Sequence, residues 1–169
     1  KANFGSLKRG EIPSLETIKG LKWATAVLRE TLRMHSVLPI VMRNAAEDDF
    51  VSKAQSGLDY DLTIPKGCGI MLGIATVHNR PDCWPKTEEF QPERFFDMDQ
   101  VDPYAWIPFI NGPRNCLGQH LSLVEMTIVL SYVFGECDFS AVDLAAAGEE
   151  HEDELPACPA EGMWVETNN

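Results

Sequence analysis

The most conspicuous absence in this sequence is positive charge in its last third. The 169 residues contain 14 Lys and Arg against 26 Asp and Glu, and the last basic residue is Arg114. The 54 residues from Cys116 onward hold 11 acidic residues and no Lys or Arg. Binding to nucleic acid or to an anionic membrane surface needs clustered positive charge, which neither part of the sequence offers. We therefore expect no nucleic-acid partner.

Paired cysteines and long apolar segments are also missing. No two of the five cysteines form a CxxC pair, which argues against a disulfide framework or a structural zinc site and favours a reducing compartment. No apolar stretch approaches the roughly 20 residues of a membrane span, and the first residues lack the apolar core of a signal peptide. Hydrophobic residues still make up 44% of the chain, enough for a packed core, so wholesale disorder is excluded.

The apolar pattern predicts two helices. The first begins at about Leu21, with apolar residues at spacings of three and four, and ends by Pro39. The second runs from about Gly118 to Phe134. Between the helices, residues 78–115 are rich in proline and aromatic residues, which favours an ordered loop over a linker.

Short strands are expected in two places. Residues 40–74 have strand character, and Ile64-Pro65-Lys66-Gly67 matches a type I turn between Leu62 and the apolar run 70–74, which predicts a hairpin. Residues 141–154 form a weak segment of alanine and acidic residues, and a further strand is expected at Met163 to Val165.

The segment from Phe109 to Gly118 carries the most specific pattern. It matches FxxGxRxCxG at every fixed position, through Phe109, Gly112, Arg114, Cys116 and Gly118. The glycines let the backbone approach a flat ligand closely, and the start of the following helix stabilises a thiolate, the form of cysteine that binds iron. The alternative is a buried structural cysteine after a turn, and the complete match argues against it.

Two further motifs precede this loop. Glu30-Thr31-Leu32-Arg33 is an ExxR pattern, and residues 90–95 read FxPERF. Glu30 and Arg33 share one helix face, and Arg94 from the loop would complete an arrangement of one carboxylate between two guanidiniums. An exposed pair of this kind contributes only a few tenths of a kcal/mol, whereas a buried triad would leave an unpaired charge if one member were removed. We assign Glu30, Arg33 and Arg94 to a structural triad rather than to catalysis.

Together and in this order, the three motifs resemble those of the cytochrome P-450 family, and the resemblance extends over essentially the whole chain. It implies a mostly helical α+β fold with small antiparallel β-sheets. Residues 1–169 would form the C-terminal part of a single domain, because family members are far longer. The long helix across the distal face of the haem is then expected to be missing from this segment.

The resemblance also implies a binding site for haem b. Cys116 would be the axial thiolate of the iron, and so both the catalytic and the metal-binding residue. Arg114 and Arg43 correspond to residues that pair with the haem propionates, although Arg43 also fits a solvated arginine at a strand end. Phe109 would cover the sulfur, and Gly112 and Gly118 would permit close approach. His35, His120 and His151 could be imagined as ligands, but a single histidine on a helix or in an acidic tail is usually a core or surface residue. The set Cys68, His78 and Cys83 loosely resembles a metal site, although its spacing matches no standard zinc pattern.

The implied reaction is insertion of one oxygen atom from O2 into a lipophilic small molecule, with electrons from NAD(P)H delivered through a reductase. Residues 37–42 and the turn near Leu155 would face the substrate. A full-length parent would lie at the cytosolic face of the endoplasmic reticulum membrane, held only by an N-terminal anchor absent from this segment. The alternative is a truncated, non-catalytic fragment that binds haem weakly or interacts with partners. Because only the proximal wall of the site is encoded, we expect the isolated chain to bind haem poorly.

Overall fold

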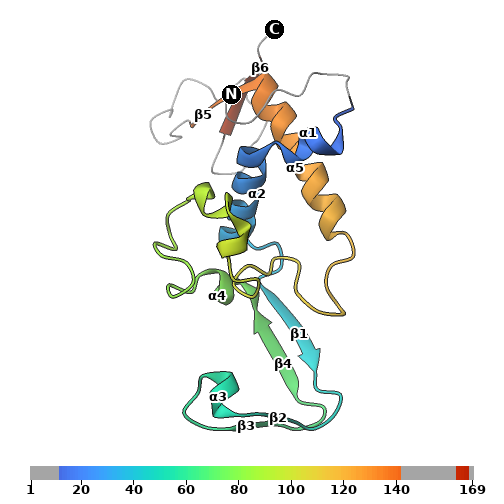
Figure 1. Ribbon diagram of the computed structural model, residues 1–169, viewed down its shortest axis with the longest axis vertical. Coiled ribbons are helices and arrows are strands. Elements are labelled where there is room, and N and C mark those ends of the chain that lie inside the picture. The colour runs from blue at the N-terminus through green and yellow to red at the C-terminus, as the bar shows by residue number, and fades with distance from the viewer. Residues whose placement is uncertain (1–11, 142–162, 168–169) are drawn as a thin grey trace, which may run out of the picture. The chain divides into compact units, whose positions relative to one another are not determined.

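The computed structural model describes residues 12–141 and 163–167 (Figure 1). The chain forms two compact units, one made of Lys1–Thr25 with His120–Asn169 and the other of Ala26–Gln119. Among the described residues, no helix is long and apolar enough to cross a membrane.

The first unit is built on helix α5 (Gln119–Glu136). Helix α1 (Leu15–Lys19) begins at Ser14, whose hydroxyl accepts a hydrogen bond from the Thr17 N–H (3.1 Å), as an N-cap does. Leu21 and Ala24 pack against Ile128 and Tyr132 of α5. Strand β5 (Cys137–Ala141) follows α5 and pairs antiparallel with β6 (Met163–Thr167). The predicted second helix and last strand are confirmed, whereas Leu155, His151 and most of segment 141–154 lie outside the described residues.

Helix α2 (Lys22–Met34) supplies the core of the second unit. It ends earlier than the predicted limit at Pro39. Its Ala26 is buried in an aromatic cluster with Trp84, Phe95 and Ala105. The rings of Trp84 and Phe95 lie 5.5 Å apart, a distance at which aromatic pairs attract each other. The loop that follows α4 (Ile74–His78) is ordered as predicted, because it supplies Trp84 and, within the 3-10 turn η1 (Pro92–Phe95), Phe95.

The strands of the second unit form a two-stranded ribbon with helix α3 (Lys53–Ser56) at its tip (Figure 1). Strand β1 (Ile40–Asn44) pairs antiparallel with β4 (Gly69–Gly73), and β2 (Asp49–Val51) pairs with β3 (Leu62–Ile64). The prediction of a hairpin across residues 64–67 is therefore wrong, because β3 and β4 lie on the same arm of the ribbon.

The turn between β3 and β4 also differs from the prediction. The Cys68 N–H donates to the Pro65 carbonyl (3.0 Å), and Gly67 has φ +81°. A glycine with positive φ at the third position is typical of a type II turn, one residue later than the predicted type I turn. The Gly67 N–H also donates to the carbonyl of Ala45 on the opposite arm (2.8 Å), so this turn continues the ribbon and does not reverse it.

Candidate functional site

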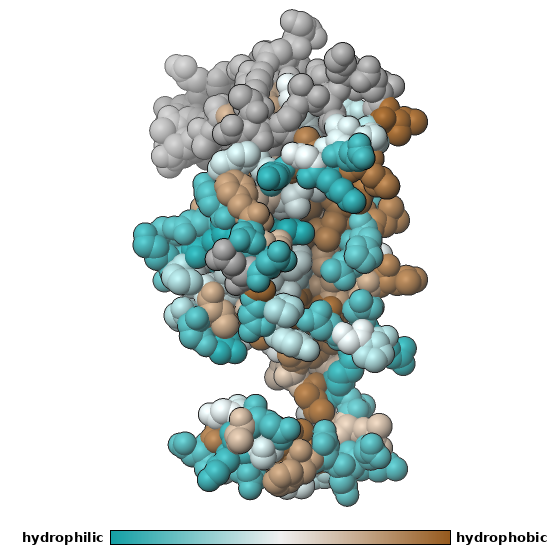
Figure 2. Space-filling view, in the orientation of Figure 1, coloured by the Kyte–Doolittle hydropathy of each residue, from teal (hydrophilic) through white to brown (hydrophobic). Residues whose placement is uncertain are grey.

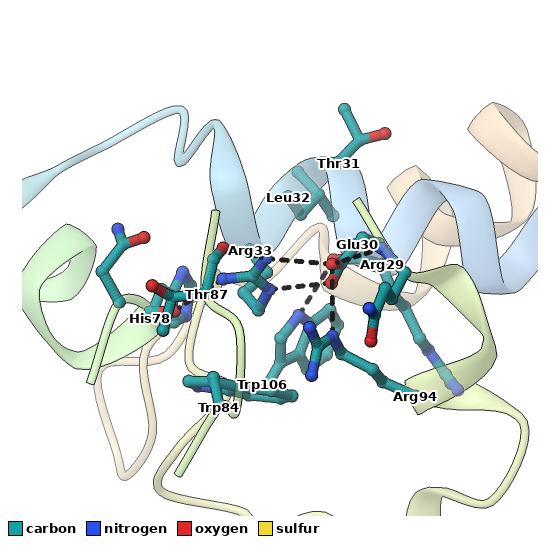
Figure 3. A network of polar contacts seen from close by, with 12 residues as sticks. Arg29, Glu30, Thr31, Leu32, Arg33, His78, Trp84, Thr87, Arg94 and Trp106 are labelled. Carbon is teal, nitrogen blue, oxygen red and sulfur yellow. Dashed lines mark hydrogen bonds and ion pairs between the residues drawn. The ribbon is translucent and has the colours of Figure 1, made fainter. Parts of the chain in front are cut away.

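A fully buried carboxylate, that of Glu30, lies at the centre of a network of polar contacts (Figure 3). Helix α2 places Arg33 one turn from Glu30, and the guanidinium donates to both carboxylate oxygens, at 2.8 Å from Nε and 2.9 Å from Nη2. The Gln91 N–H donates to Oε1 (3.0 Å), and Arg94 Nε forms an ion pair with the same oxygen at 3.5 Å. The structure thus brings the three residues of the predicted triad around one carboxylate.

Both arginines also donate to backbone carbonyls at the end of α4 and in the loop after it. Arg33 donates to the carbonyls of His78 (3.0 Å) and Thr87 (2.8 Å), and Arg94 donates to the carbonyl of Lys86 (2.8 Å). The Arg33 guanidinium also lies 5.6 Å from the centre of the Trp84 ring, within range of a cation–π interaction. The charged cluster therefore fastens residues 78–94 to α2.

His78 is a buried residue whose role the sequence analysis did not find. Its Nε2 accepts a hydrogen bond from the Ile107 N–H (2.9 Å), so Nδ1 carries the proton and donates to the Ser36 hydroxyl (2.9 Å). Burial lowers the pKa of His78 from 6.5 to about 4, against the opposing effect of nearby backbone carbonyls of Arg33 and Leu32. The imidazole is therefore neutral at pH 7.

The loose resemblance of Cys68, His78 and Cys83 to a metal site has no counterpart in the structure. Both ring nitrogens of His78 are engaged within the protein, and Cys68 is exposed whereas His78 is fully buried. Across the described parts of the chain, no three His, Cys, Asp or Glu side chains gather in a way that would hold a metal ion.

The loop from Phe109 to Gly118 is closed by backbone hydrogen bonds. The Cys116 N–H donates to the Phe109 carbonyl (2.9 Å), and the Asn115 N–H donates to the Gly112 carbonyl (3.1 Å). Ile110 (φ +62°) and Gly112 (φ +92°) have left-handed backbone conformations, which cost a residue other than glycine about 1–2 kcal/mol. The hydrogen bonds hold this unusual path and leave Cys116 exposed.

The predicted haem-binding residues divide into two groups. Phe109, Gly112, Arg114 and Cys116 lie together in this loop, and the Phe109 ring packs edge-on against Trp106 at 6.4 Å. Gly118 follows Cys116 by two residues, just before α5. Arg43 lies on β1, where its Nη1 donates to the Met42 carbonyl (2.8 Å), and no hydrogen bond or ion pair between described residues links it to the loop.

Comparison with known proteins assigns this arrangement to a family. The family model described as Cytochrome P450 matches residues 6–154. This chain belongs to the cytochrome P450 family. It is 33% identical over 129 residues to Cytochrome P450 3A16 of Mus musculus (75% of this chain, 24% of the relative). It is 37% identical over 123 residues to Cytochrome P450 4d8 of Drosophila melanogaster (73% and 26%) and 33% identical over 158 residues to Cytochrome P450 4V2 of Rattus norvegicus (90% and 28%). The chain thus spans about a quarter of the length of these relatives.

The residues of the loop fit the haem that P450 membership implies. A side-chain Cβ placed on Gly112 would meet no atom within 4 Å, so the backbone there faces open space that a flat group can occupy. Cys116 offers one exposed sulfur, and a single cysteine thiolate is the axial ligand that P450 haem uses. Leu117, beside it, is a fully exposed apolar side chain, which an apolar porphyrin would cover. The predicted α+β fold class, with helices and small antiparallel sheets, is confirmed.

Proposed function

We propose that this chain is the haem-binding, C-terminal part of a haem-thiolate monooxygenase in which Cys116 is the axial ligand. One observation carries the proposal: the exposed Cys116 thiol follows a closed loop whose Gly112 faces open space. The haem, when bound, supplies the chemistry that activates O2, so that one oxygen atom is inserted into a lipophilic substrate.

The chain's own residues would bind and orient the cofactor. Cys116 would hold the iron, and Phe109, whose ring packs on Trp106, accepts the Cys116 N–H through its carbonyl and so helps to hold the cysteine in place. Arg114 is exposed in the same loop and fits the role of partner to a propionate, since a guanidinium binds a carboxylate through two parallel N–H groups. Arg43 joins it only if its side chain turns away from the Met42 carbonyl, which is feasible because Arg43 is exposed.

A lipophilic substrate is supported by the apolar side chains at the start of β1 and just before it. Val37, Leu38, Ile40 and Met42 are exposed by 81, 58, 50 and 68%. Figure 2 shows some apolar (brown) residues among hydrophilic (teal) ones on this ribbon. Four exposed apolar side chains within six residues favour binding to something apolar.

The same proposal includes a redox partner and a location. The electrons would come from NAD(P)H through a reductase, and the full-length parent would lie on the cytosolic face of the endoplasmic reticulum membrane, anchored by a segment outside this chain. Arg114 is the last basic residue of the sequence, so α5 offers an acidic reductase no positive charge. Basic residues that precede Cys116 would have to attract it.

Protection of cysteines from alkylation tests the position of the haem. Cys68 and Cys116 are both exposed and both lie in the second unit, so they react with iodoacetamide under matched conditions. We expect excess hemin to slow labelling of Cys116 and to leave labelling of Cys68 unchanged, as measured by peptide mass spectrometry. Equal labelling of both cysteines at saturating hemin would contradict the proposal and favour the non-catalytic fragment. We also expect incomplete occupancy at one equivalent of hemin, and tight stoichiometric binding would contradict that expectation.

A further inference from the structure

We propose that His78 is a positioning residue for the cysteine loop, which it ties to helix α2 through its two ring nitrogens. The functional meaning of this tie rests on the proposed role of Cys116. The contacts of His78 itself do not involve Cys116, and the path that they begin is made of protein groups alone, so it can be tested without haem.

A path of hydrogen bonds, joined by short stretches of backbone, runs from the end of α2 to the cysteine; it begins where the Ser36 hydroxyl binds the Leu32 carbonyl of α2 (3.4 Å). Ser36, two residues after α2, binds Nδ1 of His78, and Nε2 accepts the Ile107 N–H. The Ile107 carbonyl in turn accepts the N–H of Ile110 (3.0 Å), and the neighbouring carbonyl of Phe109 accepts the Cys116 N–H (2.9 Å). The position of the Ile107 backbone therefore affects both ends of the loop.

A neutral imidazole is suited to this place. The Ile107 residue is only 8% exposed and His78 is 0% exposed, so an Ile107 N–H without an acceptor would be buried and unpaired, which is strongly unfavourable. The Ile107 N–H can only donate, so it fixes the tautomer with the proton on Nδ1, and the Ser36 hydroxyl accepts a hydrogen bond from that Nδ1–H. The charged group that faces the histidine is the guanidinium of Arg33, which binds its backbone carbonyl and disfavours a second positive charge.

A second tether ensures that loss of His78 loosens the loop without detaching it. The Trp106 Nε1–H donates to the Arg29 carbonyl of α2 (3.2 Å), one residue before Ile107, and the Arg29 guanidinium lies 5.8 Å from the centre of the Trp106 ring. Removal of the His78 acceptor should therefore increase local opening around residues 107–116 while the rest of the unit stays folded.

Two matched variants separate positioning from packing. In His78→Gln the amide oxygen takes the place of Nε2 and can still accept from Ile107. In His78→Asn the shorter side chain reaches only the place of Nδ1, so it keeps Ser36 and loses Ile107. Hydrogen exchange of the full 169-residue chain would be measured by NMR, with Val41 and Leu72, a pair in the β1–β4 ladder, as control amides.

We expect His78→Asn to speed exchange of the Ile107 amide by about tenfold, and of the Cys116 amide by a smaller factor of about three, and His78→Gln to stay within about threefold of the parent. The control amides should not change. Equal exchange in both variants, or a uniform acceleration of every amide in the unit, would overturn the proposal. If His78→Asn does not fold, Ser36→Ala takes its place, and an Ile107 amide unchanged in that variant would overturn the proposal.

The two proposals fail in different measurements. If hemin protects Cys116 from alkylation and the exchange rate of the Ile107 amide is the same in both variants, only the positioning role of His78 is refuted. If exchange responds as expected and hemin does not protect Cys116, only the haem proposal is lost.

Discussion

Replacement of Glu30 by glutamine tests how strongly the buried charged cluster stabilises the fold. The side chains of Glu30 and Arg33 are both 0% exposed, and Arg94 is 13% exposed. In Glu30→Gln the two guanidiniums keep their positive charges and lose the negative charge between them. The NH2 group of the new side chain must also face an N–H group that donates to a Glu30 oxygen in the parent. Loss of one partner from a buried ion pair costs about 3–5 kcal/mol. Since a domain of this size is stabilised by about 5–15 kcal/mol, the variant should lose about a fifth or more of its stability.

Urea unfolding, followed by intrinsic tryptophan fluorescence, measures this loss, because Trp84 packs directly against Arg33. Asp82→Asn is the matched control, since it also removes one carboxylate from an arginine pair, but the Arg80–Asp82 pair is exposed by 53 and 62%. We expect a large shift of the urea midpoint in Glu30→Gln and no measurable shift in Asp82→Asn. Equal midpoints in the two variants would refute the reasoning that the Glu30 carboxylate is a buried structural charge.

Three further perturbations follow from the same structure. The pKa of His78 is about 4 in the folded chain and 6.5 in the unfolded chain, so the unfolded chain binds the proton first as the pH falls, and the folded state should lose about 3 kcal/mol of stability between pH 6.5 and pH 4. This loss should disappear in His78→Gln, and urea midpoints with the same pH profile in the parent and in that variant would contradict the prediction. Gly112→Ala places a Cβ on a backbone with φ +92° and should lower the free energy of unfolding in urea by about 1–2 kcal/mol. Gly69 also faces open space but has no positive φ, so Gly69→Ala should lower it little, and equal losses in the two variants would count against backbone strain at Gly112. Trp106→Phe removes the N–H that binds the Arg29 carbonyl and should cost about 1 kcal/mol in urea unfolding, so an unchanged midpoint would show that this tether adds no stability.

Local sequence patterns predicted the helices and the cysteine loop well, because they depend on residues close together in the chain. The apolar spacing of α2 and α5 is a property of each helix alone, and the fixed positions of the loop all fall within ten residues. The turn at residues 64–67 was misassigned for the opposite reason. Whether a turn reverses the chain or continues a ribbon depends on which distant strand pairs with each arm, and the pairing of β1 with β4 is not visible in a local pattern.

Non-local contacts also explain what was missed at the site. The sequence placed His78 in a loose metal-like set, since nothing near it in the chain indicates that its partners are Ser36 and the Ile107 backbone, 42 and 29 residues away. The hydrogen bond from Arg33 to the Thr87 carbonyl could not be predicted either, because every residue has a backbone carbonyl and the sequence does not show which one is used. The grouping of Glu30 with Arg94 was expected from the ExxR and FxPERF motifs and from the pairing of guanidiniums with a carboxylate, and the structure adds that the carboxylate is buried.

The most direct test of the central claim is the carbon monoxide difference spectrum of the reduced, hemin-loaded chain. Thiolate ligation by Cys116 predicts the red-shifted Soret band for which the P450 family is named, in the parent chain and in Cys68→Ser, which removes another exposed thiol of the same unit. In Cys116→Ser the band should be absent, although hemin is still present. A red-shifted band of undiminished intensity in Cys116→Ser, or its absence from the parent chain at saturating hemin, would contradict the assignment of Cys116 as the haem ligand.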